Sequence, residues 1–237
     1  SERRLGAELA TRPRDEFVIS TKVGRLLEPS PELAGERDSG GFDVPADHVR
    51  VWDFSRDGIL RSVEESLTRT GLDRFDILYL HDPDDHFEQA STEGIQTLIE
   101  LRGQGVVRAV GAGMNSAQYL TQLIERADVD IVMCAGRFTL LDSSAVTDLL
   151  PLAHERGVGI VAAGIYNSGL LATPRPPANA TYDYVQAPAE LIQRAHRIAD
   201  ACEEHGVTLP DAAIAYVLRH PAVVSVVVGV RTPAQLT

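Results

Sequence analysis

The sequences FVISTKV (residues 17–23) and DILYLH (residues 76–81) decide the fold. Each is a short, mostly apolar run of the kind that forms a strand buried on both faces of a parallel sheet. The first run carries Lys22 at its end, and the second ends in His81. Because α/β enzymes place their chemistry at the carboxyl ends of such strands, the pattern predicts an enzyme and nominates both side chains.

The same pattern recurs along the chain. Further apolar runs occupy residues 106–111, 130–135, 158–163 and 224–229. Helical patterns separate the runs, and we find no hairpin signals, which predicts a parallel sheet. Two connections, residues 24–54 and 171–187, follow strand ends and are too long to be simple linkers. Helices are expected over residues 1–10, from residues 53–55 to a stop at Gly71, over 92–102, after a Ser116 cap, from a Ser143 cap to Arg156, and over 189–205 and 209–219.

Six strands fit either an open doubly wound sheet or an incomplete eight-stranded barrel. The chain begins on a helical pattern without a preceding strand, and it ends as another helical pattern begins. These features favour a (β/α)8 TIM barrel lacking its first two strands and its C-terminal end in this chain. With 237 residues, we expect one partial barrel domain over residues 1–237.

Composition narrows the class of protein. The net charge of −12 argues against a duplex nucleic-acid binder, which needs a basic face. No segment has the pattern of a signal peptide or a membrane span, so a cytoplasmic enzyme is expected. Cys134 and Cys202 lack CxxC spacing and are expected to be buried thiols. The oligomeric state is left open.

Four stretches together resemble the aldo-keto reductases, in order and spacing over essentially the whole chain. They are residues 17–24, 72–81, 105–111 and 228–236. HDPDDH (residues 81–86) and YNSGLL (residues 166–171) are most similar to the family's aldose dehydrogenase branch, which includes L-fucose and D-threo-aldose 1-dehydrogenases and pyridoxal 4-dehydrogenase. The resemblance implies a nicotinamide-dependent oxidoreductase that oxidises a sugar at C1 to a lactone, or reduces an aldehyde.

The resemblance also implies catalytic roles. The family uses a Tyr, Lys, His and Asp tetrad, of which Lys22 and His81 match two members. A Tyr-Gly pair in the family precedes a Ser-Glu-x-x-Leu-Gly helix, and this chain starts at that Ser-Glu, so the tyrosine and aspartate are expected upstream of Ser1. A tyrosine of ordinary pKa ~10 must be acidified to act as a base near neutrality, and a lysine ammonium does this. His81 is expected to orient the substrate oxygen.

The implied cofactor is NAD or NADP. The family's carboxamide-binding pair aligns with Gly113 and Met114, so Asn115 is the candidate substitute. NAD is favoured, because Gly229 and Gln235 stand where basic residues usually hold a 2′-phosphate. The full set of candidate cofactor residues is Asn115, Arg137, Tyr166, Asn167, Ser168, Gly169, Leu170, Gly229, Arg231 and Gln235.

Two other functions remain open at this point. A metal-dependent hydrolase on the same barrel would use His81, Asp82 and His86, although a solvated acidic loop suits this stretch better than a metal site. A non-catalytic cofactor-binding regulatory subunit is the second alternative. The aromatic residues of the long connections either pack those loops or line the substrate pocket; they are Phe42, Trp52, Tyr182 and Tyr184.

Overall fold

The computed structural model describes residues 2–33, 35–38, 44–183, 185–230, 232 and 235. Contacts divide the chain into two compact units, Ser1–Ala112 and Gly113–Thr237. The single partial domain over residues 1–237 remains a prediction. Among the helices that the structure describes, none has the length and apolar character needed to span a bilayer.

The six predicted strands are confirmed. They are β1 (Ser20–Val23), β4 (Ile77–His81), β5 (Ala109–Met114), β6 (Ile131–Ala135), β7 (Gly159–Ala163) and β10 (Val223–Val226). Hydrogen bonds connect them in the order β1-β4-β5-β6-β7-β10, and the pairs β1–β4, β5–β6, β6–β7 and β7–β10 are parallel. β1 begins later than predicted, because the Asp76 carboxylate accepts the Ile19 N–H at 2.8 Å in place of a strand partner.

The helices follow the strands much as predicted. They are α1 (Glu2–Leu9), α2 (Arg56–Thr70), α3 (Phe87–Gln89), α4 (Ile95–Gly103), α5 (Ala117–Arg126), α6 (Leu149–Arg156), α7 (Ala189–Glu204) and α8 (Leu209–Leu218), with 3-10 turns η1 (Arg14–Glu16), η2 (Pro31–Leu33) and η3 (Asp84–His86) and a π turn η4 (Ala90–Gly94). The Ser116 hydroxyl accepts an N–H group of the first turn of α5, which confirms the predicted cap, and the Ser55 hydroxyl caps α2 in the same way. Gly71 ends α2 in the left-handed conformation at φ 69°.

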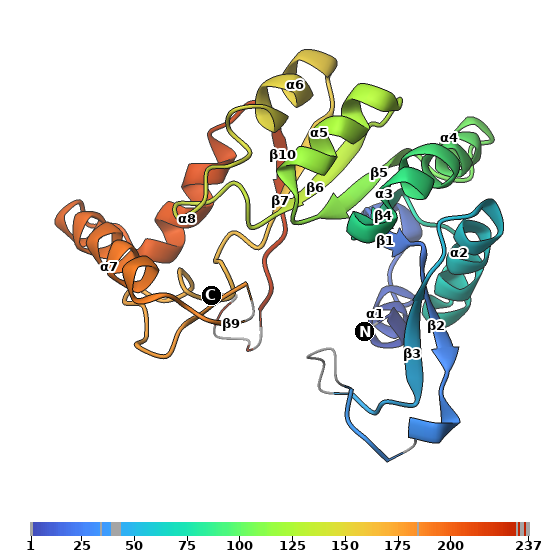
Figure 1. The fold of residues 1–237 in the computed structure, drawn as a ribbon, viewed down its shortest axis with the longest axis horizontal. Coiled ribbons are helices and arrows are strands. Elements are labelled where there is room, and N and C mark those ends of the chain that lie inside the picture. The colour runs from blue at the N-terminus through green and yellow to red at the C-terminus, as the bar shows by residue number, and fades with distance from the viewer. Residues whose placement is uncertain are drawn as a thin grey trace. The chain divides into compact units, whose positions relative to one another are not determined.

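Two predictions about local structure were wrong. Ser143 does not cap a helix, because α6 begins at Leu149 and residues 144–148 form turns. The chain also contains antiparallel hairpins, within the two long connections: β2 (Arg25–Pro29) pairs with β3 (His48–Trp52), and β8 (Thr181–Tyr182) pairs with β9 (Val185–Gln186) (Figure 1). β2 and β3 are joined by a long segment, and the β8–β9 turn lacks the Asn-Gly or Asp-Gly sequence that marks tight hairpins.

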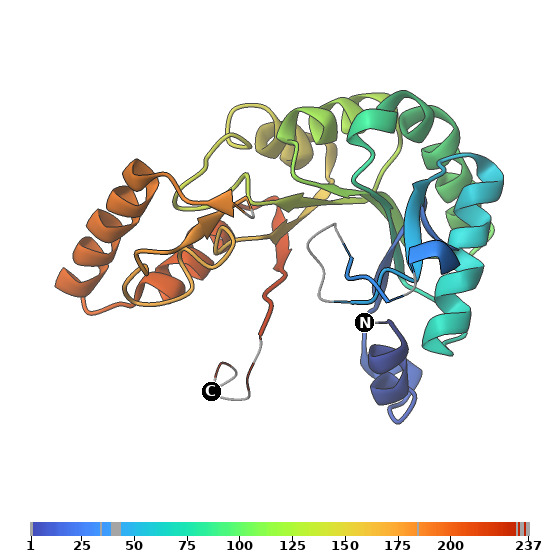
Figure 2. The same cartoon turned by 60° about the horizontal axis from the view of Figure 1, so that its bottom comes forward.

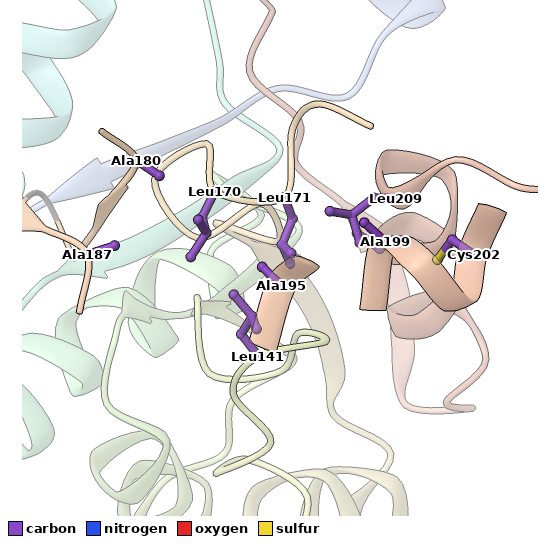
Figure 3. Packing of buried hydrophobic residues seen from close by; sticks show 10 residues of the cluster. Leu141, Leu170, Leu171, Ala180, Ala187, Ala195, Ala199, Cys202 and Leu209 are labelled. Atoms are coloured by element: carbon purple, nitrogen blue, oxygen red, sulfur yellow. The ribbon is translucent and has the colours of Figure 1, made fainter. Parts of the chain in front are cut away.

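Each unit has its own core. In Ser1–Ala112, α2 packs against β1 and α4, with Ile59, Leu80 and Leu98 fully buried. In Gly113–Thr237, α5 and α6 lie side by side along β6 and β7 (Figures 1 and 2). A separate cluster joins α7 and α8 to the segment after β7 (Figure 3). Cys134 and Cys202 are free and buried, as predicted.

Candidate active site

Lys22 and His81 lie on neighbouring strands of the first unit. Lys22 of β1 is in register with Tyr79 of β4, and His81 is the last residue of β4. Since side chains alternate between the two faces of a strand, Tyr79, His81 and Lys22 share one face. The structure therefore brings together both residues that the sequence nominated.

The His81 ring is largely buried among charges. Its side chain is 27% exposed, and its Nε2 atom lies 3.4 Å from Asp82 Oδ2 and 3.4 Å from Arg25 Nη1. Burial, with the charges of Lys22 and Arg25, lowers the pKa of His81 to about 3. The imidazole is therefore neutral near pH 7, and one ring nitrogen can donate a hydrogen bond while the other accepts one.

Arg25 is a site residue that the sequence analysis missed. It opens β2 directly after β1 and is in register with Trp52, and its guanidinium carbon lies 4.8 Å from the centroid of the Trp52 ring. Its Nη1 atom is 3.7 Å from Asp82 Oδ2. Burial, followed by the charge of Arg50, lowers the pKa of Arg25. The signal was present in the continuous stretch TKVGR (residues 21–25), but the pairing with Trp52 depended on the unpredicted hairpin.

A glycine and a phenylalanine shape the turn that delivers Arg25. Gly24 has φ +86°, and a Cβ there would lie 2.3 Å from the Phe54 ring, so only glycine fits. The His86 ring stacks on Trp52 with the ring centroids 6.3 Å apart, and it lies tilted against Phe54 at 6.1 Å. Trp52 thus both packs the loop and contacts Arg25, whereas Phe42 and Tyr184 lie outside the described residues.

Two further groups bear on the chemistry. Asp82 has φ 43°, an uncommon conformation for a residue with a side chain, and burial is the main cause of its raised pKa. Tyr79 is 1% exposed, and burial raises its pKa to about 12. That phenol stays protonated near neutrality and is unsuited to be the general base. Among the described residues, no group of three or more His, Cys, Asp and Glu side chains is arranged to hold a metal ion.

The second unit contains a cavity of about 250 Å³ at the carboxyl ends of β6, β7 and β10. Several predicted cofactor residues line it, together with glycines that the sequence analysis did not nominate. The lining includes Asn115, Gly136, Gly164, Tyr166, Asn167, Ser168, Gly169, Asp183, Val227 and Gly229. This position is where open α/β sheets and barrels bind ligands.

Asn167 provides a test of whether a nicotinamide cofactor fits. The residue is 3% exposed, and its Nδ2 atom donates a hydrogen bond to the Gly136 carbonyl oxygen at 3.4 Å. Its Oδ1 atom is buried and accepts no hydrogen bond from the described residues. A buried acceptor without a donor costs about 1–3 kcal/mol, so the site favours a ligand that carries an N–H group. The carboxamide of a nicotinamide carries such a group, so the residues fit.

Two glycines bring the ends of β6 and β7 close together at this cavity. Gly136 and Gly164 have φ +70° and φ +60°. A Cβ on Gly164 would lie 3.1 Å from the Gly136 nitrogen. A side chain at either position would strain the backbone, and one at Gly164 would also press against the Gly136 nitrogen.

Arg137 is engaged by protein groups. Its Nε donates to the Asn115 carbonyl at 2.7 Å, and its Nη atoms lie 3.2 Å from Asp142 and 2.9 Å from Asp183. Tyr182 donates its hydroxyl hydrogen to Asp142 at 3.3 Å. Arg137 therefore ties the β8–β9 turn to the end of β6. Its side chain lines a second cavity of about 310 Å³, which shares Asn115 with the first.

The remaining predicted cofactor residues have other surroundings. Leu170 is fully buried in the α7–α8 cluster (Figure 3), which gives it a packing role. The Gln235 side-chain oxygen accepts the Thr232 N–H at 3.2 Å. Arg231 lies outside the described residues.

Comparisons with known proteins show the family of the chain. The model of the Aldo/keto reductase family matches residues 1–237. D-threo-aldose 1-dehydrogenase from a Pseudomonas species is 50% identical over 240 residues, covering 100% of this chain and 73% of the relative. Pyridoxal 4-dehydrogenase from Microbacterium luteolum is 40% identical, covering 99% of this chain and 73% of the relative.

Solved structures show the same fold. A glycerol dehydrogenase from Gluconobacter oxydans gives a TM-score of 0.75 at 22% identity, over 100% of this chain and 69% of that one. The holo form of an aldo-keto reductase from Bacillus halodurans gives 0.71 at 25% identity, over 99% and 70%. None of these relatives supports the metal-dependent hydrolase. The chain belongs to the aldo/keto reductase family and is an NAD(P)-dependent oxidoreductase with the barrel fold of that family.

Proposed function

We propose that this enzyme oxidises an aldose at C1 to a lactone and, in reverse, reduces the corresponding carbonyl group. One observation carries the chemistry: Lys22 and a neutral His81 share one face of adjacent parallel strands. The curated relatives named for D-threo-aldose and pyridoxal support a small hydroxylated substrate. In the forward direction the C1 hydrogen leaves with two electrons as a hydride, and the C1 hydroxyl proton passes to a base.

His81 and Lys22 have separate roles in this proposal. The neutral His81 ring donates a hydrogen bond to the oxygen on C1 and holds it in a reactive orientation. The Lys22 ammonium lowers the pKa of the tyrosine that the family resemblance implies as the base, so that the phenolate accepts the hydroxyl proton. Lys22 is the single lysine among the 237 residues, and arginine occupies every other position counted under Lys+Arg. A compact ammonium suits this role better than a guanidinium, which spreads its charge over a planar fork.

The cavity of the second unit would hold the cofactor, which accepts or gives the hydride when bound. Asn167 Oδ1 would accept an N–H of its carboxamide, and Gly136 and Gly164 would allow its close approach. We favour NAD over NADP. Gly229 brings no positive charge to the cavity lining, and the Gln235 oxygen is engaged by Thr232, so neither is equipped to hold a 2′-phosphate.

Two measurements on the intact protein test this function. Fluorescence titration with NADH and NADPH should show tighter binding of NADH, and a clear preference for NADPH would overturn that choice. Steady-state assays across aldoses and pyridoxal should show turnover for at least one sugar. Lys22→Met should lower turnover at pH 7 by about 10²-fold or more while the cofactor dissociation constant changes little. Near-normal turnover in that variant would reject the role of Lys22.

A further inference from the structure

Arg25 holds a charge that the catalytic roles assigned so far do not use. Its side chain is 17% exposed, and its Nε atom is buried and donates no hydrogen bond to the described residues. Its closest polar neighbours, His81 Nε2 at 3.4 Å and Asp82 Oδ2 at 3.7 Å, are farther than the 2.7–2.9 Å typical of charge-assisted hydrogen bonds. The guanidinium therefore keeps hydrogen-bonding capacity beside the catalytic imidazole.

The fold fixes this guanidinium in place without using up its donors. The guanidinium carbon lies over the Trp52 ring, 4.8 Å from its centroid, and this cation–π contact uses no hydrogen-bond donor of Arg25. The β2–β3 register sets Arg25 opposite Trp52, and the Gly24 turn against Phe54 fixes the start of β2. The nearby Arg50 is paired with Asp38 at 2.8 Å and does not take this position.

Asp82 supplies an acceptor next to this donor. Its backbone has φ 43°, which costs roughly 1–2 kcal/mol for a residue with a Cβ. Strain of this kind persists where the surrounding structure imposes it, and it is concentrated at functional sites. Its Oδ2 atom lies 3.4 Å from His81 Nε2, which is longer than a strong hydrogen bond.

Three atoms thus form a small triangle, with His81 Nε2 3.4 Å from both Arg25 Nη1 and Asp82 Oδ2, which are 3.7 Å apart. Arginine only donates hydrogen bonds, and an ionised carboxylate only accepts them. A hydroxyl group does both, so one hydroxyl placed between Arg25 Nη1 and Asp82 Oδ2 can accept a hydrogen bond from Arg25 and donate one to Asp82. A carbonyl oxygen or a methylene group at the same place satisfies one or neither.

We propose that Arg25 and Asp82 bind the C2 hydroxyl of the aldose while His81 binds the oxygen on C1. Oxygens on adjacent carbons are close enough to reach neighbouring corners of the triangle. The pair thereby selects substrates that carry a hydroxyl next to the reacting carbon. This inference rests on the proposed function, because it assigns a substrate group to the same site.

The experiment compares kcat/KM for an aldose and its 2-deoxy analogue in the intact wild-type protein and in Arg25→Met, Asp82→Asn and the double variant. Wild type should prefer the 2-hydroxy sugar by about 10²-fold or more, because the analogue leaves Arg25 and Asp82 without a partner. Each single variant should reduce this preference to below about tenfold, mainly by losing rate with the 2-hydroxy sugar. The double variant should show little further loss, because both residues hold the same hydroxyl.

Arg50→Met is the matched control, since it removes another arginine of the same hairpin. It should leave the ratio between the two sugars unchanged. If Arg25→Met lowers kcat/KM for both sugars by the same factor, Arg25 has a structural role and the inference is wrong. If wild type turns over both sugars equally, the inference fails while the proposed function stands. Absence of turnover with every sugar, with cofactor binding intact, overturns both.

Discussion

The buried, neutral state of His81 predicts how stability depends on pH. Its pKa is about 3 in the folded protein against 6.5 for an ordinary histidine. Between these values the unfolded chain takes up a proton that the folded protein does not. The stabilising contribution of the neutral ring is therefore complete above about pH 6.5 and is lost as the pH falls toward 3. His81→Gln removes this titration while it keeps a neutral polar side chain.

The size of the effect follows from the two pKa values. Each pH unit below 6.5 costs the folded state about 1.36 kcal/mol until the pH approaches 3. At about pH 4.5, two units below 6.5, wild type should have lost about 2.7 kcal/mol through His81 alone. His81→Gln escapes this loss. The difference in unfolding free energy between the two proteins should therefore change by about 2.7 kcal/mol in favour of the variant between about pH 7.5 and 4.5.

Urea unfolding at both pH values measures this difference. The chain contains one tryptophan, Trp52, whose fluorescence reports the unit that contains His81. Other titrating groups are common to both proteins and cancel. A change below about 1 kcal/mol for His81→Gln would show that the folded protein protonates His81, and the argument for a neutral ring would fail.

Two further predictions concern the cofactor cavity and its surroundings. Gly164→Ala should lower the unfolding free energy by about 1–2 kcal/mol, because it forces a Cβ into a left-handed position 3.1 Å from the Gly136 nitrogen. Gly103→Ala is the control, because it lies at an open helical position, and it should not destabilise the protein. Equal effects of the two changes in urea unfolding would contradict the reasoning. Arg137→Gln should lower the unfolding free energy by about 1–2 kcal/mol in the same assay, mostly because it leaves the partly buried Asp142 without its ion pair. An unchanged unfolding free energy would show that this ion-pair network does not hold the β8–β9 turn.

Sequence reasoning was most successful where a local pattern fixes the structure. Strands buried on both faces must be apolar along their length, so β4 and β7 were recognisable as isolated runs. Lys22 and His81 stood out because they are polar residues at the ends of such runs. Ser116 and Gly71 were recognisable because helix ends need a particular side chain or a left-handed residue.

The missed features depend on contacts between distant residues. Arg25 acquires its role from Trp52 and His81, which lie far along the chain and meet it only through strand pairing. The unsatisfied Asn167 oxygen depends on the left-handed backbone of that residue and on the neighbouring Gly136. Arg137 was expected to contact a cofactor, since nothing in its local sequence announces the pairing with Asp183.

The β2–β3 hairpin separates two tasks that many active sites combine. Arg25 and Trp52 lie on this hairpin, whereas Lys22 and His81 belong to the parallel strands (Figure 1). In the proposed site, a change in the hairpin alters Arg25 and Trp52 without altering Lys22 and His81, whereas Asp82 directly follows β4. A graft of residues 25–52 between family members would therefore exchange the arginine half of the proposed recognition and leave the strands that carry the reaction in place.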